Sequence, residues 1–214
     1  MRTARFVAVL LVVSVPVAWA ASGSQDGAMA HRLVISRSDA RALYHHFVWA
    51  WPAKALPCQM PVEPDHGMTA AATGNWGGVQ SQLWSTASVA RAQSGAARLY
   101  DDLLDAAPTC LLRTAQGGTP TYKQLFCNTS ARLSRLWAGR YGDRSSAWRA
   151  VFSSHASPDG VCTLHALDGV IVQTGRAVAY YLFDNVYLVN SAVASRTTAQ
   201  DEAIVGRAVG RVAA

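Results

Sequence analysis

VIVQTGRAVAYYLF, residues 170–183, is the stretch that decides the fold of this 214-residue chain. Two runs rich in strand-forming residues, Val170–Val172 and Ala177–Phe183, flank a short polar connection that contains Gly175. Glycine adopts the backbone angles that a tight turn between strands requires. The stretch therefore predicts a β-hairpin.

Strand patterns continue on both sides of this hairpin. Upstream, Ser146–Ser153 and Val161–Leu167 alternate apolar and polar residues, and part of Tyr122–Trp137 is also typical of a strand. Downstream, Asn185–Val193 extends the strand region. Alternation with a period of two is the pattern of a strand with one buried face. The last third of the chain is therefore predicted to consist mostly of short strands.

Three segments carry helical patterns. Thr86–Ala107 has the clearest apolar stripe, and Pro108 is expected to end it. Ser36–Trp51 is predicted as a helix with Ser38 as its N-cap. Thr198–Val212 is predicted as a closing helix. Helices combined with a separate group of strands indicate a single α+β domain.

The first twenty residues have the pattern of an export signal. Arg2 and Arg5 precede an apolar run, Phe6–Val17, and small residues surround the expected cleavage point near Ala20. The run is short for a membrane span, so no stable membrane insertion is expected after cleavage. No cysteine lies directly after the cleavage point, so a lipid anchor there has no attachment atom. The sequence predicts a secreted, extracellular protein.

These signals divide the chain into three parts. Residues 1–20 are predicted as a signal peptide, residues 21–35 as a flexible lead-in, and residues 36–214 as one domain. Pro52 and Pro57 are expected to end the preceding helix, and the segment rich in proline and glycine from Cys58 to about Gly78 is expected to be a long loop.

Composition argues against several classes of partner and cofactor. The formal charge is +6, but the arginines are scattered and Lys54 and Lys123 are the only lysines. A nucleic-acid surface needs a basic stripe with stacking aromatic residues, so no nucleic-acid partner is expected. The chain has no His-Glu-x-x-His helix and no glycine-rich phosphate loop. No metal and no cofactor are therefore expected.

The four cysteines are predicted to form two disulfides. An even number of cysteines in an exported chain favours disulfides over free thiols, and the spacing lacks the paired cysteines of a zinc or redox site. Three pairings are possible. Sequential pairing is preferred because its loops do not interlock, and it joins Cys58 to Cys110 and Cys127 to Cys162.

Several segments, in order, resemble a known family of exported actinobacterial sensor domains. This family is related to the extracellular domain of the receptor serine/threonine kinase PknH. The similar segments are Ser36–Pro57 leading into Leu56-Pro57-Cys58, Ala87–Cys110, Tyr141–Arg144, Asp168–Arg176 and Gly206–Val212. The resemblance implies a twisted antiparallel sheet flanked by helices, stabilised by disulfides and enclosing a cleft. It also implies a non-enzymatic, ligand-sensing role outside the cell, for an unknown small-molecule or cell-envelope ligand.

Five residues are candidates for ligand contact. Asp65, His66 and Trp76 lie in the predicted loop, where a tryptophan either packs over a core or contacts a ligand. Tyr180 and Tyr181 are adjacent in a strand and must face opposite sides. One of the two is therefore expected to line a cleft while the other contacts solvent.

Two further classes of function stay open. The first is a secreted hydrolase with an unrecognised catalytic site among Asp143, His155, Asp159 and His165. The second is a structural or protein-binding envelope factor, for which the partner is another protein. A cleft lined by convergent titratable groups favours the hydrolase, and an apolar or aromatic cleft favours ligand binding.

Overall fold

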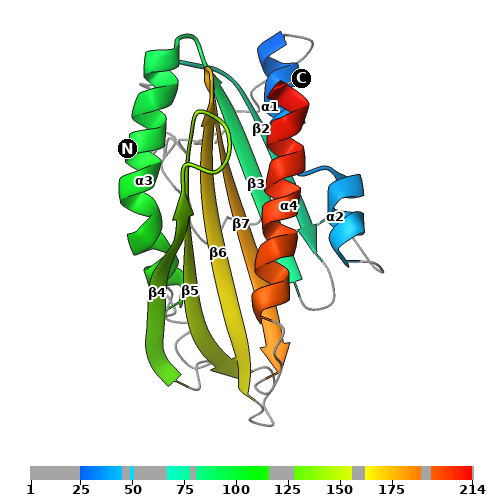
Figure 1. The fold of residues 1–214 in the computed structure, drawn as a ribbon, viewed down its shortest axis with the longest axis vertical. Coiled ribbons are helices and arrows are strands. Elements are labelled where there is room, and N and C mark those ends of the chain that lie inside the picture. Colours follow the sequence, from blue (N-terminus) through cyan, green and yellow to red (C-terminus); the bar gives the residue numbers. More distant parts are fainter. Residues whose placement is uncertain are drawn as a thin grey trace, which may run out of the picture.

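The computed structural model describes residues 25–44, 49–50, 67–77, 81–115, 128–155, 162–188 and 194–213. The chain is α+β, with one antiparallel sheet flanked by helices (Figure 1). This confirms the class of fold predicted from the sequence. The predicted signal peptide, residues 1–20, lies outside the described residues.

The described strands form a single seven-stranded sheet in which every neighbouring pair is antiparallel. In spatial order they are β1 (Trp49–Ala50), β2 (Met68–Gly77), β3 (Ser81–Ala90), β7 (Ala177–Leu188), β6 (Cys162–Thr174), β5 (Arg144–His155) and β4 (Asn128–Ala138). The predicted hairpin is β6–β7. Thr174 pairs with Ala177 across a two-residue turn in which Gly175 has a φ of 55°. This positive φ explains the glycine.

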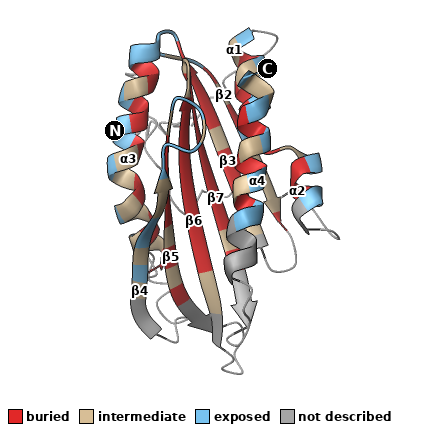
Figure 2. Cartoon of the chain, in the orientation of Figure 1, coloured by how far each residue is buried: buried red, intermediate tan, exposed pale blue. Residues whose placement is uncertain are grey.

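Strand β7 is buried on both of its faces, which explains its unbroken apolar sequence. Successive side chains enter two separate cores, one on each side of the sheet. Figure 2 shows the buried residues running along the central strands. The side chains on one face are Ala179, Tyr181 and Phe183, and those on the other are Val178, Tyr180 and Leu182.

The described helices divide between the two faces of the sheet. They are α1 (Gln25–Leu33), α2 (Arg37–Tyr44), α3 (Gln93–Ala115) and α4 (Ala194–Ala213). Helix α3 packs on β4, β5 and β6 on one face, here called the α3 face. Helices α1 and α4 contact each other and pack on the opposite face, here called the α4 face (Figure 1). Within the described residues, no helix is long and apolar enough to span a membrane.

The prediction of a flexible lead-in over residues 21–35 is wrong from Gln25 onward. Gln25–Leu33 forms α1, and Ala30, Leu33 and Ile35 are buried. The segment contains many small residues, so its apolar pattern is weak in the sequence. Its helix is stabilised by packing against β2, β3 and α4 rather than by its own propensity.

The predicted helix over Ser36–Trp51 is shorter in the structure. It ends at Tyr44, and Trp49–Ala50 forms β1. Its N-cap is Ser36 rather than Ser38: the Ser36 Oγ accepts a hydrogen bond from the Asp39 backbone N–H at 3.1 Å. The Asp39 carboxylate accepts one from the Ser36 N–H at 3.0 Å. Together they make a reciprocal capping box.

The predicted helix over Thr86–Ala107 begins and ends later than expected. Residues 86–90 belong to β3, and α3 starts at Gln93. Pro108 does not end the helix, which continues to Ala115. Beyond the proline, Leu111 and Ala115 are buried against the sheet. Burial of such side chains offsets the roughly 3 kcal/mol that a proline costs inside a helix.

Candidate functional site

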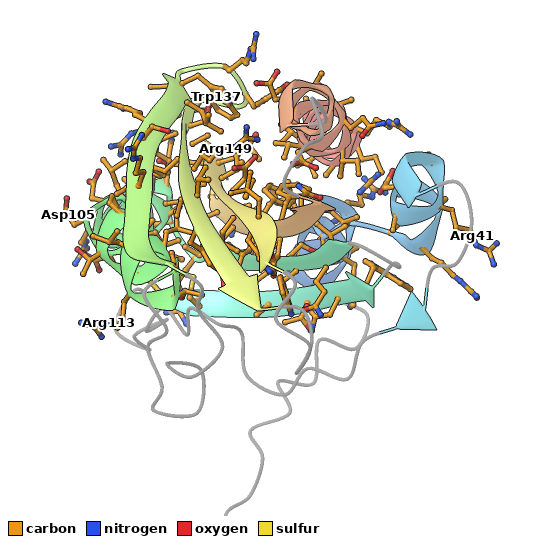
Figure 3. The ribbon with its side chains drawn as sticks, turned by 90° about the horizontal axis from the view of Figure 1, so that it is seen from below. Arg41, Asp105, Arg113, Trp137 and Arg149 are labelled. Carbon is orange, nitrogen blue, oxygen red and sulfur yellow. The ribbon has the colours of Figure 1, made fainter. Side chains whose placement is uncertain are left out.

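A groove of about 400 Å³ opens between the end of β4 and helix α4. Figure 3 shows why it forms: the sheet curls so that β4 rises beside α4, and Trp137 and Arg149 lie in the space between them. Helix α4 packs on β6 and β7, which lie two and three positions from β4 in the sheet. The lining residues are Leu136, Trp137, Ala138, Gly139, Arg140 and Glu202.

The rim of the groove is tied to α4 by polar and aromatic contacts. Arg140 forms an ion pair with Glu202, with 2.5 Å between Nη1 and Oε2. The hydroxyl of Tyr141 donates a hydrogen bond to the Glu202 carbonyl at 3.0 Å. The Tyr141 ring meets Trp137 edge to face, with centroids 5.3 Å apart. A Cβ at Gly206 would lie 3.2 Å from that tyrosine ring, so glycine permits this close approach.

The turn that carries Arg140 and Tyr141 is organised by one hydroxyl group. The Ser145 Oγ accepts hydrogen bonds from the backbone N–H groups of Arg140 and Tyr141, at 2.8 and 2.9 Å. Gly142 has a φ of 59°, and a Cβ there would lie 2.4 Å from the Gln173 carbonyl oxygen. Burial raises the pKa of the Tyr141 hydroxyl, so it stays a hydrogen-bond donor. The rim is therefore held in one conformation by local structure.

An ion pair lies on the sheet close to the groove. Arg149 on β5 is directly opposite Asp168 on β6. The guanidinium binds both carboxylate oxygens, with Nε to Oδ1 at 2.7 Å and Nη2 to Oδ2 at 2.5 Å. The Asp168 side chain is only 2% exposed. Burial raises the pKa of Asp168, and the guanidinium opposes part of that rise.

A second buried carboxyl group approaches the same ion pair from α4. Asp201 is 3% exposed, and its Oδ2 accepts a hydrogen bond from the Asn185 Nδ2 at 3.0 Å. Its Oδ1 has no hydrogen-bond partner among the described residues. Burial raises the pKa of Asp201 well above its usual range, and the charge of Asp168 adds to the rise. The site therefore combines one cation with two buried carboxyl groups.

Trp76 was predicted to lie in a loop, but it is part of β2. Its indole N–H donates a hydrogen bond to the Ile35 carbonyl at 2.8 Å, and its ring packs against the core of the α4 face. The glycine at 74 is required by packing, since a Cβ would lie 2.7 Å from the Ile35 oxygen. Trp76 therefore anchors the α1–α2 connection. Asp65 and His66 lie outside the described residues.

Tyr180 and Tyr181 face opposite sides of the sheet, as predicted, but neither contacts solvent. Tyr181 is fully buried on the α4 face, and its hydroxyl donates to the Leu33 carbonyl at 2.8 Å. Tyr180 is 3% exposed beneath α3, and its hydroxyl has no partner among the described residues. The sheet is covered on both sides here, so the expectation that one of them is solvated is wrong. Neither residue lines the groove described above.

The residues of the hydrolase hypothesis are not brought together where they are described. Asp143 lies at the turn end of β6. Its carboxylate accepts a hydrogen bond from the Gly175 N–H at 2.6 Å, and the backbone N–H of Asp143 donates one to the Gln173 carbonyl at 2.8 Å. His165 lies eight positions from Gln173 along β6, which corresponds to about 26 Å at 3.3 Å per residue. There the His165 Nδ1 forms a hydrogen bond with the Asp184 Oδ1 at 3.0 Å. Asp159 and the side chain of His155 are not described.

The predicted disulfide pairing stays a prediction. Cys110 lies in α3 and is disulfide-bonded. Cys58 and Cys127 are outside the described residues, and the side chain of Cys162 is not described. Among the described residues, no group of three or more metal-ligating side chains could hold a metal ion.

Sequence reasoning did not single out the charged residues of this site, although two of them carry a signal. Arg149 alternates with Trp148 and Ala150, so it faces the side opposite to that apolar pair. Asp201 lies at helical spacing from Ile204, Val205 and Ala208, which places a carboxyl group on the buried stripe of α4. A charge on an apolar stripe requires a buried partner, and that is the signal that could have found the site.

Comparisons with known proteins bear on the fold. No family model and no curated protein matches the sequence. The extracellular domain of PknH from Mycobacterium tuberculosis matches in structure with a TM-score of 0.50 and 8% identity, over 87% of this chain and 95% of that one.

Two weaker likenesses have lower TM-scores. LpqN of Mycobacterium tuberculosis, involved in cell envelope biogenesis, has a TM-score of 0.30 and 14% identity, over 77% of this chain and 92% of that one. The lipid transfer and protein localization domain of human StarD13 has a TM-score of 0.19 and 11% identity, over 82% and 94%. Neither adds to the assignment of the fold. By its likeness to the first structure, the chain has the fold of the PknH extracellular domain, as the sequence resemblance predicted.

Proposed function

We propose that this protein is a secreted, non-enzymatic, sensor-like domain that binds a small-molecule or cell-envelope ligand in the groove between β4 and α4. The observation that supports this most directly is the groove itself. Its volume of about 400 Å³ is in the range of small-molecule sites, and its lining combines apolar walls with a charged rim. The likeness in fold to an extracellular domain agrees with a role outside the cell.

The lining of the groove offers an aromatic wall and two charged groups to a ligand. Trp137 lines the groove, but its indole Nε1 is buried and is therefore not presented to the groove. Arg140 and Glu202 add one positive and one negative group at the rim. The groove is therefore suited to a ligand that has both an apolar part and polar groups.

Export and disulfide formation belong to the same proposal. Cleavage of the signal peptide near Ala20 places the domain in an oxidising compartment, where Cys58–Cys110 and Cys127–Cys162 would form. N-terminal analysis and non-reducing peptide mapping of exported protein should give this start and these two pairs. Any other pairing, or four free thiols, would contradict this part of the proposal.

Filling the groove provides the test of ligand binding. Ala138 is exposed on β4 and lines the groove, so Ala138→Trp adds bulk there without entering the core. Protein purified from its native medium should carry a retained compound in native mass spectrometry. In Ala138→Trp, occupancy should fall about tenfold or more, the change that 1.4 kcal/mol of affinity produces.

A variant of matched size controls for general effects of a surface tryptophan. Thr109 is exposed on α3, so Thr109→Trp should retain the compound at the wild-type level. Equal loss in both variants, or no retained compound in the wild type, would contradict the groove as the binding site.

A further inference from the structure

Asp201 connects the buried ion pair of the sheet to the wall of the groove. Its side chain points from α4 towards the sheet and is held there through Oδ2 by Asn185 on β7. The next residue, Glu202, lines the groove and pairs with Arg140. Any change in how Asp201 sits against the sheet therefore moves a residue of the groove wall.

Burial first, and then the charge of Asp168, make the ionisation of Asp201 unfavourable while α4 is docked, and the charge of Arg149 offsets part of this effect. Among the charged groups, Asp168 on β6 has the largest effect on Asp201, and Arg149 on β5 binds both oxygens of Asp168. Glu202, on α4 itself, adds a further negative charge. Asp201 Oδ1 has no hydrogen-bond donor among the described residues. A proton on Asp201 removes the repulsion, and the loss of that proton restores it.

The two halves of α4 are held in different ways. Near its C-terminal end, Arg211 donates hydrogen bonds to the Arg32 and Val34 carbonyls at 2.9 and 3.0 Å, and pairs with Asp39 at 2.8 Å. None of these contacts involves Asp201. In the N-terminal half, the polar contacts described are those of Asp201 and Glu202. Repulsion at Asp201 therefore acts on the half that borders the groove.

We propose that α4 is a proton-controlled wall of the groove: with Asp201 protonated its N-terminal half docks on β6 and β7, and with Asp201 ionised beside Asp168 that half loosens and the groove widens. The direction of the pH effect follows from linkage. Burial raises the pKa of Asp201 in the docked state, whereas in a loosened, solvated state the pKa returns to its ordinary range.

Three pH regions follow from these two pKa values. Below the ordinary aspartate range both states hold the proton, and pH has no effect. Between that range and the raised pKa, only the docked state holds the proton, so docking weakens as pH rises. Above the raised pKa, the weakening is complete.

Hydrogen exchange of the full mature chain, without ligand, tests this proposal. Exchange is measured across pH and corrected for its intrinsic pH dependence. Protection of residues 199–206 should fall with rising pH, by up to about tenfold per pH unit in the linked region, while residues 207–213 change less. Asp201→Asn is neutral at every pH and keeps an oxygen for Asn185, so its protection should not follow pH in this way.

An exposed aspartate supplies the matched control. Asp105 lies on the outer side of α3 (Figure 3), so Asp105→Asn should keep the wild-type pH dependence. A wild-type profile that is flat in pH, or one unchanged by Asp201→Asn, would overturn the proposal.

If Asp201→Asn fails to fold, the carboxyl ¹³C shift of Asp201 in wild-type protein decides the question. Titration in the ordinary aspartate range would overturn the proposal, and titration above that range supports it. Since no ligand is used, failure of this test leaves the proposed binding function standing.

Discussion

The two faces of the sheet are built differently. The α3 face is closed by one long helix over aromatic and aliphatic side chains, including Trp148, Phe152 and Tyr180. The α4 face is covered by two helices, α1 and α4. It also contains every buried carboxyl group of the described residues, which are those of Asp39, Asp168 and Asp201.

The difference separates stability from function. An apolar face gains its free energy from burial and needs few specific contacts. Buried charges add little net stability, but each needs a particular partner and therefore fixes a particular arrangement. On the α4 face, Asp168 and Asp201 lie close to the groove, where Glu202 follows Asp201 on α4. Both faces thus have an apolar core that stabilises the fold, and the α4 face adds the buried polar groups that a ligand or a proton could contact.

The largest effect is expected from breaking the ion pair of the α4 face. Arg149→Leu leaves Asp168 buried without its cation, which should lower the free energy of unfolding by about 3–5 kcal/mol. The double variant Arg149→Leu/Asp168→Leu removes both charges and should recover most of this loss. Urea denaturation of the two variants and the wild type measures both effects.

A small destabilisation by Arg149→Leu would contradict the proposed difference between the two faces. If Arg149→Leu costs less than about 1 kcal/mol, the pair behaves like an exposed one. The α4 face would then not depend on its buried charges. A double variant as unstable as the single one would also show that repacking, rather than the unpaired charge, causes the loss.

The adjacent tyrosines of β7 give a smaller and sharper comparison. Tyr181→Phe deletes a buried hydrogen bond and leaves the Leu33 carbonyl without its donor, so it should cost about 1–2 kcal/mol. Tyr180→Phe deletes a hydroxyl that has no partner among the described residues. It should therefore be neutral or stabilise the protein by up to about 1 kcal/mol.

Both variants remove one oxygen from neighbouring positions of one strand, so each is the control for the other. Chemical denaturation at constant pH measures the pair. Equal destabilisation would mean that the α3 face holds a partner for the Tyr180 hydroxyl, and the contrast between the faces would be reduced.

The sequence predicted the centre of the fold better than its edges. The hairpin of β6 and β7 was predicted because its apolar run and its glycine turn are both local signals. The predictions at Pro108 and Gly74 were wrong, because packing determines the structure at both positions: Pro108 was expected to end a helix and Gly74 to lie in a loop. Pro108 is tolerated inside α3 by the burial of Leu111, and Gly74 lets the backbone at Ile35 approach β2.

The site could not be assembled from the sequence because its contacts are not local. Arg149, Asp168, Asn185 and Asp201 come from three strands and one helix, and only the register of the sheet brings them together. The tyrosines and Trp76 were chosen for their chemistry alone. In the structure, Trp76 and Tyr181 donate hydrogen bonds to the backbone carbonyls of Ile35 and Leu33, and the Tyr180 hydroxyl is buried in the core.

Arg211 has a consequence for the order in which the molecule is completed. Its side chain donates hydrogen bonds to the carbonyls of Arg32 and Val34, which lie 179 and 177 positions earlier in the chain, and these bonds complete the α4 face. Contacts between distant residues form late because a long chain must be brought together first. The β6–β7 hairpin needs only its neighbours in sequence. We therefore expect α1 to pack on β2 and β3 first, and the α4 face to be completed only when the last turn of α4 brings Arg211 to the carbonyls of Arg32 and Val34.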